Sequence, residues 1–346
     1  MTEFPVPLLE GLTGRQRDQA LHLFEQVTVH HGTPLMVEGD VDPSLLYVLD
    51  GELEIRTGDV DLWTAKPGEM VGEIGLFTEG VRTATVETNT EATLLILTRE
   101  GYEELVERDN PVAMRIEEFA LAALVQRLRA VDVRIAELAQ GTELADVTPP
   151  KSWFDRVTAL FGAGGQRATP KIDIVKALAG SRLFEGVYSG TLEGVASVFQ
   201  PEAWGPGEFL CTEGERGEDM YMVVSGLVDV LVATQGERVE PVATLDEGDI
   251  FGMAGLVDNR PRSATCITRD EVVVLRLDRT GWARTVGRAD PAGRVLRVAM
   301  IRSLAEQLAF ANGQLALVEL TTKAQDLTPL KLAAAGIEVA GRGLGG

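Results

Sequence analysis

The chain has 346 residues, and 53 Asp and Glu against 32 Lys and Arg give it a formal net charge of −21. This length predicts about two domains, each able to bury a core, and the charge repels nucleic acid and anionic lipid unless a local patch overrides it. The two cysteines, Cys211 and Cys266, are too few for a disulfide framework and indicate a reducing cytoplasm.

In chain order, the first predicted element is a short helical lead-in over residues 8–25, where leucines recur at helical spacing. From Gln26 the pattern changes to short β runs separated by turn residues. Asp50-Gly51 stands between two of these runs and predicts a β-hairpin. The last strong strand of this region is expected at residues 93–97, TLLIL.

A glycine-rich stretch within this β region, PGEMVGEIGLFTEGVRTATV, occupies residues 67–86. Its glycines mark a tight turn before a short helix, and unpaired backbone N–H groups at such a turn form a pocket for an anion. Arg82 can close that pocket as a planar, permanently charged phosphate clamp. Glu73 would repel a phosphate and instead suits the hydroxyl donors of a ribose.

The same stretch resembles the phosphate-binding cassette of the cyclic-nucleotide-binding domains, which occur in bacterial catabolite activators, kinase regulatory subunits and gated channels. The resemblance implies that Gly72 offers its N–H to the ligand, that Glu73 takes the ribose 2′-OH and that Arg82 pairs with the cyclic phosphate. Further ligand contacts are implied at Ile74, Thr83 and Ala84. Val71 departs from the pattern, because the family usually has Phe there.

Each β region is followed by a predicted helix with a long apolar seam. Residues 121–138 and 301–318 both carry apolar side chains spaced 3-4-3-4-3, which is coiled-coil periodicity. Two such helices can pair within one chain, as an internal pseudo-dimer, or between chains in a homodimer. The alternative is that each helix packs only on its own β domain.

The second half of the chain repeats the first, which predicts two domains of one fold. Gly72 and Arg82 recur 180 positions later as Gly252 and Arg262. Gly11, Gly39 and Gly51 recur 175 positions later. The five-residue difference falls near residues 233–236, in a predicted hairpin where insertions are tolerated. Together with the resemblance, the repeat predicts a mainly β protein of two tandem jelly-roll-like β-barrels with flanking helices.

The second cassette, GDIFGMAGLVDNRPRSAT, keeps the phosphate-binding pattern but lacks the ribose carboxylate. Met253 stands at the position of Glu73, and a thioether is only a weak hydrogen-bond acceptor. The resemblance implies ligand contacts at Gly252, Arg262, Ser263 and Ala264. We therefore expect the second pocket to be weak, tuned to a different ligand, or empty.

The expected domains are residues 1–140 and 181–318, each including its long helix. A linker over 141–180 carries a predicted short amphipathic helix at 151–161, and residues 319–346 are expected to form a flexible tail. The chain shows no basic, apolar leader typical of a signal peptide and no apolar run near the roughly 18 residues of a membrane span.

No residue pattern predicts catalysis, and the three histidines are too few and too clustered for a metal site. The sequence therefore predicts a cytoplasmic receptor for a cyclic mononucleotide, cAMP or cGMP, with no other cofactor and with an unidentified protein partner. A DNA-binding regulator is a weaker alternative, because no basic recognition helix follows either long helix. A third interpretation is a scaffold that keeps the fold without binding a ligand.

Overall fold

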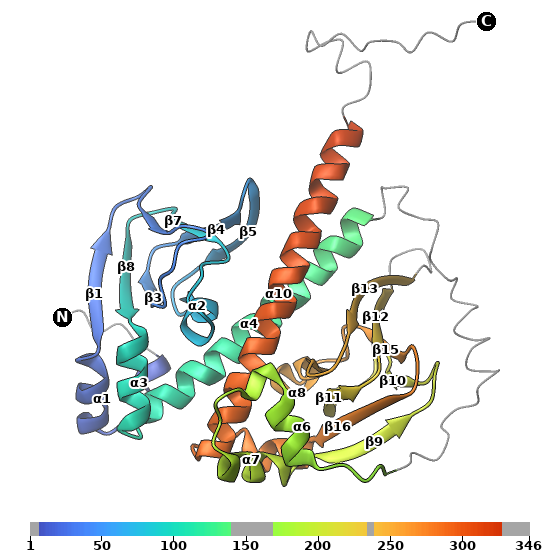
Figure 1. Cartoon of the computed structure of the whole chain (residues 1–346). Helices are drawn as coiled ribbons and strands as arrows, with labels where there is room; N and C mark the ends of the chain where they lie inside the picture. The colour runs from blue at the N-terminus through green and yellow to red at the C-terminus, as the bar shows by residue number, and fades with distance from the viewer. Residues whose placement is uncertain (1–6, 140–168, 234–238, 327–346) are drawn as a thin grey trace, which may run out of the picture.

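The computed structural model describes residues 7–139, 169–233 and 239–326. They form two β domains on either side of a pair of long helices (Figure 1). The linker helix predicted at 151–161 and the tail beyond residue 326 lie outside the described residues. Within the predicted linker, the described part contains α6 (Ile174–Gly180).

The strands of the first domain form two four-stranded antiparallel sheets, ordered β1-β8-β3-β6 and β2-β7-β4-β5. Their bounds are β1 (Phe24–Val29), β2 (Pro34–Met36), β3 (Leu45–Asp50), β4 (Leu53–Thr57), β5 (Val60–Ala65), β6 (Met70–Val71), β7 (Thr85–Thr88) and β8 (Ala92–Leu97). The short helices of this domain are η1 (Pro7–Leu9), α1 (Gly14–Leu21), α2 (Glu73–Phe77) and α3 (Arg99–Glu107).

The second domain repeats this strand order as β9-β16-β11-β14 and β10-β15-β12-β13. Its strands are β9 (Gln200–Trp204), β10 (Phe209–Cys211), β11 (Asp219–Ser225), β12 (Val228–Ala233), β13 (Val239–Leu245), β14 (Ile250–Phe251), β15 (Thr265–Thr268) and β16 (Val272–Asp278). Its short helices are η2 (Arg182–Phe184), α7 (Ser189–Ala196), α8 (Ala254–Asp258) and α9 (Arg279–Thr285). Each domain is an open β-sandwich, which confirms the predicted mainly β, jelly-roll-like class.

Glycines at the turns that connect the two sheets explain why the two halves share these turns. Gly51, between β3 and β4, has a φ of 88°, and an added Cβ would lie 2.5 Å from the backbone oxygen of Glu91. Gly226 has a φ of 87° and its Cβ would lie 2.4 Å from the oxygen of Glu271. Only glycine fits both the positive φ and the close backbone contact. The turn at Asp50-Gly51 is therefore present, but the predicted hairpin is wrong, because β3 pairs with β6 and β8 in one sheet while β4 pairs with β5 and β7 in the other.

The helical lead-in is shorter than the sequence pattern indicates. Thr13 and Gln16 form a capping box at the start of α1, which ends at Leu21. Strand β1 then begins at Phe24, two residues before the predicted change of pattern, because Phe24 already pairs with Leu97 of β8.

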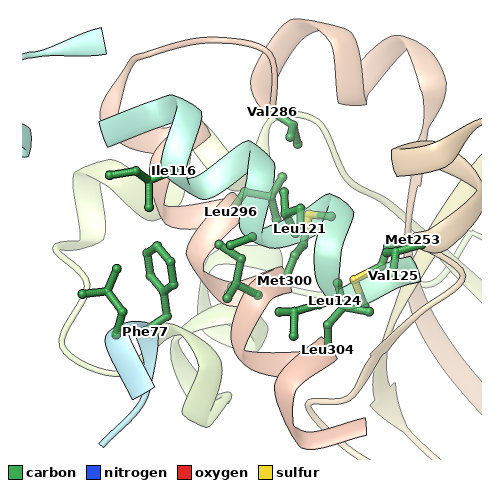
Figure 2. Close-up of a cluster of buried hydrophobic side chains, with 14 of the residues drawn as sticks. Phe77, Ile116, Leu121, Leu124, Val125, Met253, Val286, Leu296, Met300 and Leu304 are labelled. Carbon is green, nitrogen blue, oxygen red and sulfur yellow. The ribbon is translucent and has the colours of Figure 1, made fainter. Parts of the chain in front are cut away.

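The two long helices, α4 (Pro111–Ala139) and α10 (Pro291–Asp326), pack against each other in the centre of the molecule (Figure 1). Leu121 and Leu124 of α4 meet Met300 and Leu304 of α10 in one buried cluster (Figure 2). The helix seams therefore pair within a single chain, as one of the predicted arrangements requires.

Helix α10 runs farther than predicted. The flexible tail is expected from residue 319 onward, but the helix continues to Asp326. Gly313 does not end it, since this exposed glycine faces outward and has nothing within 4 Å of the place that a Cβ would take. A single glycine costs a helix only about 1 kcal/mol, which the packing against α4 offsets.

A buried ion pair joins the long helices near their crossing. Arg297 of α10 donates from Nε to Oε2 of Glu117 of α4 over 2.6 Å, and both side chains are 1% exposed. Tyr102 of α3 donates its hydroxyl to the other oxygen of Glu117 at 2.7 Å, and Arg297 also donates to the backbone oxygen of Arg288 at 2.7 Å. These partners compensate the desolvation of both charges.

None of the described helices combines the length and the apolar character needed to cross a membrane.

Candidate functional site

The first cassette turns at Gly72, the residue before α2. Its backbone has φ 95° and ψ 4°, and an added Cβ would lie 2.7 Å from Nη1 of Arg82 and 2.7 Å from the backbone oxygen of Ser44. Any larger residue would push the arginine away from the turn. Gly72 is thus required both for the positive φ and for the close approach of the guanidinium.

Arg82 lies at the base of this turn and is 4% exposed. Its Nη2 lies 2.8 Å from Oδ2 of Asp42 and 2.8 Å from the backbone oxygen of Ser44, while the buried Nε has no hydrogen-bond partner among the described residues. Burial raises the pKa of Asp42, but the hydrogen bonds from Arg82 and Ser44 and the charge of Arg82 together outweigh burial, so that this pKa is lowered overall. A buried permanent cation with an unused N–H is suited to an anionic ligand.

Glu73 begins α2 and is 1% exposed. One of its carboxylate oxygens forms an ion pair with Arg127 of α4, whereas the other, Oε2, is buried without a hydrogen-bond partner in the described structure. Arg127 also donates to the backbone oxygen of Met70 at 2.7 Å and lies over the ring of Trp63. A buried carboxylate oxygen without a donor is a costly arrangement that a ligand hydroxyl would relieve.

These groups converge on one cavity of about 150 Å³. All six residues predicted for the first cassette line it, namely Gly72, Glu73, Ile74, Arg82, Thr83 and Ala84. The wall opposite the cassette comes from the long helices, with Arg127 and Val131 of α4 and Leu308 and Asn312 of α10. These wall residues are absent from the sequence-based prediction, because only the crossing of the helices places them here.

The second cavity is larger, about 330 Å³, and all four predicted residues line it, namely Gly252, Arg262, Ser263 and Ala264. Arg262 is buried and donates to the backbone oxygens of Asp219 at 2.8 Å and Gly252 at 2.5 Å. Gly217 stands at the position of Asp42. Within the described ranges no carboxylate forms an ion pair with Arg262, so the two arginines differ in their charged surroundings.

The missing ribose carboxylate of the second cassette is accompanied by a second change. Met253 is 1% exposed and lies beside Val125 of α4 in the buried cluster (Figure 2). The position equivalent to Arg127 is Gln307, which donates to the backbone oxygen of Ile250 at 2.8 Å. In the first domain, Glu73 of the cassette and Arg127 of the long helix form an ion pair. In the second domain both partners are replaced, Glu73 by Met253 and Arg127 by Gln307.

Each cavity is also completed by the long helix of the other domain. Asn312 of α10 lines the first cavity, and its Oδ1 is buried without a hydrogen-bond partner among the described residues. The equivalent residue of α4, 180 positions earlier, is Asp132, which lines the second cavity. Burial raises the pKa of Asp132 from its ordinary value of 3.8 to about 6; nearby Arg129 opposes this rise, and Glu213 adds to it.

Replacing Asp132 by asparagine, the residue found at the equivalent position 312, should stabilise the protein above about pH 6 but not near pH 4. The folded chain holds the Asp132 proton more tightly than the unfolded chain, so this residue lowers the free energy of unfolding as pH rises from about 4 to about 6. We expect Asp132→Asn to gain about 1–3 kcal/mol at pH 8 and almost nothing at pH 4. Urea unfolding at both pH values measures this, and an equal gain at both would assign the effect to packing instead.

Comparison with known proteins identifies the same two regions. The sequence profile of the cyclic nucleotide-binding domain matches residues 26–109 and 201–288. The cGMP-dependent protein kinase egl-4 of Caenorhabditis briggsae is 20% identical over 284 residues, which are 82% of this chain and 30% of the kinase. The cyclic AMP receptor protein of Thermus thermophilus is 33% identical over 134 residues, which are 37% of this chain and 60% of that protein.

Solved structures with a similar chain include the regulatory domain of Toxoplasma gondii PKA crystallised with cAMP. It is 20% identical, with a TM-score of 0.32, and the match covers 82% of this chain and 88% of that one. The present chain spans only about 30% of the length of the first kinase relatives. On the two profile matches and the repeated sandwich topology, this chain belongs to the cyclic nucleotide-binding family and carries two such domains in tandem.

Proposed function

We propose that this chain is a regulatory receptor that binds a cyclic mononucleotide, cAMP or cGMP, in the first cavity. The observation that carries the proposal is that a buried cation, Arg82, and a buried carboxylate, Glu73, line one cavity, and that each has a buried polar atom without a hydrogen-bond partner among the described residues. A cyclic phosphate supplies the anion and the neighbouring ribose 2′-OH supplies the donor. No other part of the nucleotide requires a charged group.

The cyclic phosphate would replace Asp42 as the anion beside Arg82. The Asp42 side chain is 41% exposed, so it can turn into water when a ligand arrives, whereas Arg82 is held in place by Ser44 and Gly72. Asp42 keeps the guanidinium paired while the cavity holds no ligand. The exchange of one anion for another leaves the buried charge of Arg82 compensated throughout.

The signal would leave the site through Glu73 and Arg127. A ribose hydroxyl that donates to Glu73 withdraws negative charge from the ion pair that fastens the cassette to α4. Since α4 packs on α10, a change at this contact alters the preferred position of the helix pair. Such coupling requires that the nucleotide bind one helix position better than the other.

A protein is the partner that best fits the outer surface of the helix pair. Val133 of α4 and Leu317 of α10 are exposed apolar side chains, while the net charge of −21 opposes a nucleic-acid backbone. The relatives include the regulatory subunit of the cAMP-dependent protein kinase of Candida albicans, 33% identical over 93 residues, 27% of this chain and 19% of that protein. We place the receptor in the cytoplasm, because its two cysteines are too few for a disulfide framework.

The proposal is tested by the thermal unfolding of the full chain with cAMP, cGMP or linear 5′-AMP. Either cyclic nucleotide should raise the unfolding temperature, because a ligand that binds only the folded state stabilises it. Linear 5′-AMP adds a second phosphate charge and should give little shift. An equal shift with all three nucleotides, or none with the cyclic ones, would contradict a cyclic-nucleotide site.

The second site should gain affinity only when both of its altered residues are restored. Met253→Glu alone places a carboxylate among apolar side chains, so we expect it to destabilise the protein by about 1–3 kcal/mol. Met253→Glu with Gln307→Arg recreates the ion pair of the first site and should raise the affinity of the second site about 10- to 100-fold.

Calorimetric titration with cAMP and cGMP measures both variants of the second site. The matched control is the reverse exchange in the first domain, Glu73→Met with Arg127→Gln, which should weaken the first site by a similar factor. If the second site of Met253→Glu with Gln307→Arg binds the nucleotides no more tightly than that of the wild type, the loss of this ion pair does not explain why the two sites differ in affinity.

A further inference from the structure

The second cavity contains a pair of thiols that the proposed receptor mechanism does not use. Cys211 on β10 and Cys266 on β15 stand directly opposite each other in the antiparallel pairing, and both line the second cavity beside Arg262. They are the two cysteines of the chain. The first domain has Met36 and Val86 at the equivalent register positions, where both line the first cavity.

We infer that Cys211 and Cys266 are a redox modification site in the floor of the second cavity, where a small hydroperoxide converts the two thiols into a cross-strand disulfide. Directly opposed residues of antiparallel strands have Cα atoms roughly 4.5–5.5 Å apart. A disulfide requires roughly 4.4–6.8 Å. The strands therefore need not separate or slide for the bond to form.

The surroundings assign different roles to the two sulfur atoms. The hydrogen bond with Cys266 lowers the pKa of the Cys211 thiol, burial opposes this, and Arg262 lowers it further. The hydrogen bond with Cys211 and burial raise the pKa of the Cys266 thiol. Cys211 is also the more exposed of the two residues, 8% against 4%, so we assign Cys211 as the attacking thiolate and Cys266 as the resolving thiol.

The oxidation proceeds in two balanced steps. The Cys211 thiolate attacks one peroxide oxygen and breaks the O–O bond, which gives a sulfenic acid and a hydroxide that takes up the proton lost by the thiol. The Cys266 sulfur then attacks the Cys211 sulfur and displaces the hydroxyl group, which leaves as water with the Cys266 proton. Two thiols are oxidised by two electrons, and one hydroperoxide is reduced to two waters, or to one water and an alcohol.

The disulfide changes the second cassette because it removes a hydrogen bond between Cys211 and the backbone of that cassette. The Cys211 thiol donates to the backbone oxygen of Ala264 over 3.9 Å, and Ala264 lies two residues after Arg262 in the ligand-facing part of that cassette. A disulfide has no S–H and cannot make this hydrogen bond. The first cavity has no thiols at these positions and is unaffected by the reaction.

The experiment treats the full chain with hydrogen peroxide, unfolds it, blocks remaining thiols with N-ethylmaleimide and measures the intact mass. We expect the loss of two hydrogens, no maleimide adduct, and full reversal by a reductant, with no nucleotide present at any stage. The same oxidation in concentrated urea should be many-fold slower, since unfolding separates the opposed strands. Chains linked to each other, or stable oxygen adducts without a disulfide, would overturn the inference.

Single variants identify the attacking sulfur. With Cys266→Ser, peroxide should leave a sulfenic acid at Cys211 that dimedone traps; with Cys211→Ser, Cys266 should remain largely unlabelled. Equal labelling of both variants would contradict the assigned roles. If the wild-type disulfide formed at the same rate in the folded and the unfolded chain, the fold would not be what brings the two thiols together. A failure of nucleotide binding would leave these masses unchanged, so the two proposals are separable.

Discussion

Replacing Arg297 by methionine should lower the free energy of unfolding by about 3–5 kcal/mol. The substitution leaves Glu117 buried and charged; among the described residues it keeps the Tyr102 hydroxyl as a close donor and Arg294 at 3.7 Å. A buried carboxylate without its counter-ion is among the most costly single changes in a protein core. Urea unfolding at neutral pH measures the loss.

Two further variants separate the buried charge from other effects of the substitution at Arg297. Arg297→Met with Glu117→Gln removes the stranded charge but keeps an acceptor for Tyr102, so it should recover much of the lost stability. Arg108→Met breaks a surface pair with Glu104, in which both side chains are more than a third exposed, and should cost at most about 1 kcal/mol. A loss below about 1 kcal/mol for Arg297→Met itself would show that this ion pair does not hold the helix crossing.

Replacing Arg82 by alanine should weaken the binding of a cyclic mononucleotide about 30-fold to a few thousand-fold, which corresponds to roughly 2–5 kcal/mol. The variant would leave the cyclic phosphate in a desolvated cavity without its cation. Its free energy of unfolding should fall by only about 1–3 kcal/mol, because the backbone oxygens of Ser44 and Gly72 lose a donor while the released Asp42 is 41% exposed and can be solvated. Calorimetric titration gives the affinity and urea unfolding gives the stability.

Two controls accompany the Arg82 variant. Arg82→Lys keeps the charge but loses the planar fork, so its affinity should lie between those of the wild type and alanine. Arg56→Ala removes a half-exposed arginine from β4 of the same domain, where it is 4.0 Å from Glu87, and should leave the affinity unchanged. Binding by Arg82→Ala within threefold of the wild type would mean that the phosphate lies elsewhere.

The repeat and the cassettes could be predicted from the sequence because they depend on glycines that no other residue can replace. Gly51 and Gly72 both have a positive φ and contact backbone or guanidinium atoms closely. Such positions fix turns locally, so their spacing identifies the same fold in both halves. The phosphate-facing residues follow, since they lie within a few positions of those turns in the chain.

The walls of the cavities could not be predicted, because they depend on how two helices cross. The 3-4 spacing of apolar residues indicates that α4 and α10 pair, but it does not say which polar residues then face a ligand. Arg127 and Asn312 belong to the first cavity only because α4 and α10 cross beside the first cassette. Asp132 reaches the cassette of the other domain for the same reason.

Met253 shows the same limit at one position. The sequence reveals that the ribose carboxylate is absent from the second cassette, and from this alone Met253→Glu would be expected to restore it. The structure adds that Met253 is buried against α4 and that Gln307 has taken the place of Arg127. A glutamate there has no cation, so the lost function involves two residues that are 54 positions apart in the chain.

The most direct test of the central claim counts the nucleotides bound per chain by equilibrium dialysis with labelled cAMP and cGMP. We expect one tight site, which Arg82→Ala removes and Arg262→Ala leaves in place. Any second site should be weaker by about 10-fold or more, since it lacks the ribose carboxylate. Two equal sites in the wild type, or a tight site that survives Arg82→Ala and is lost with Arg262→Ala, would contradict a receptor that works through its first cassette.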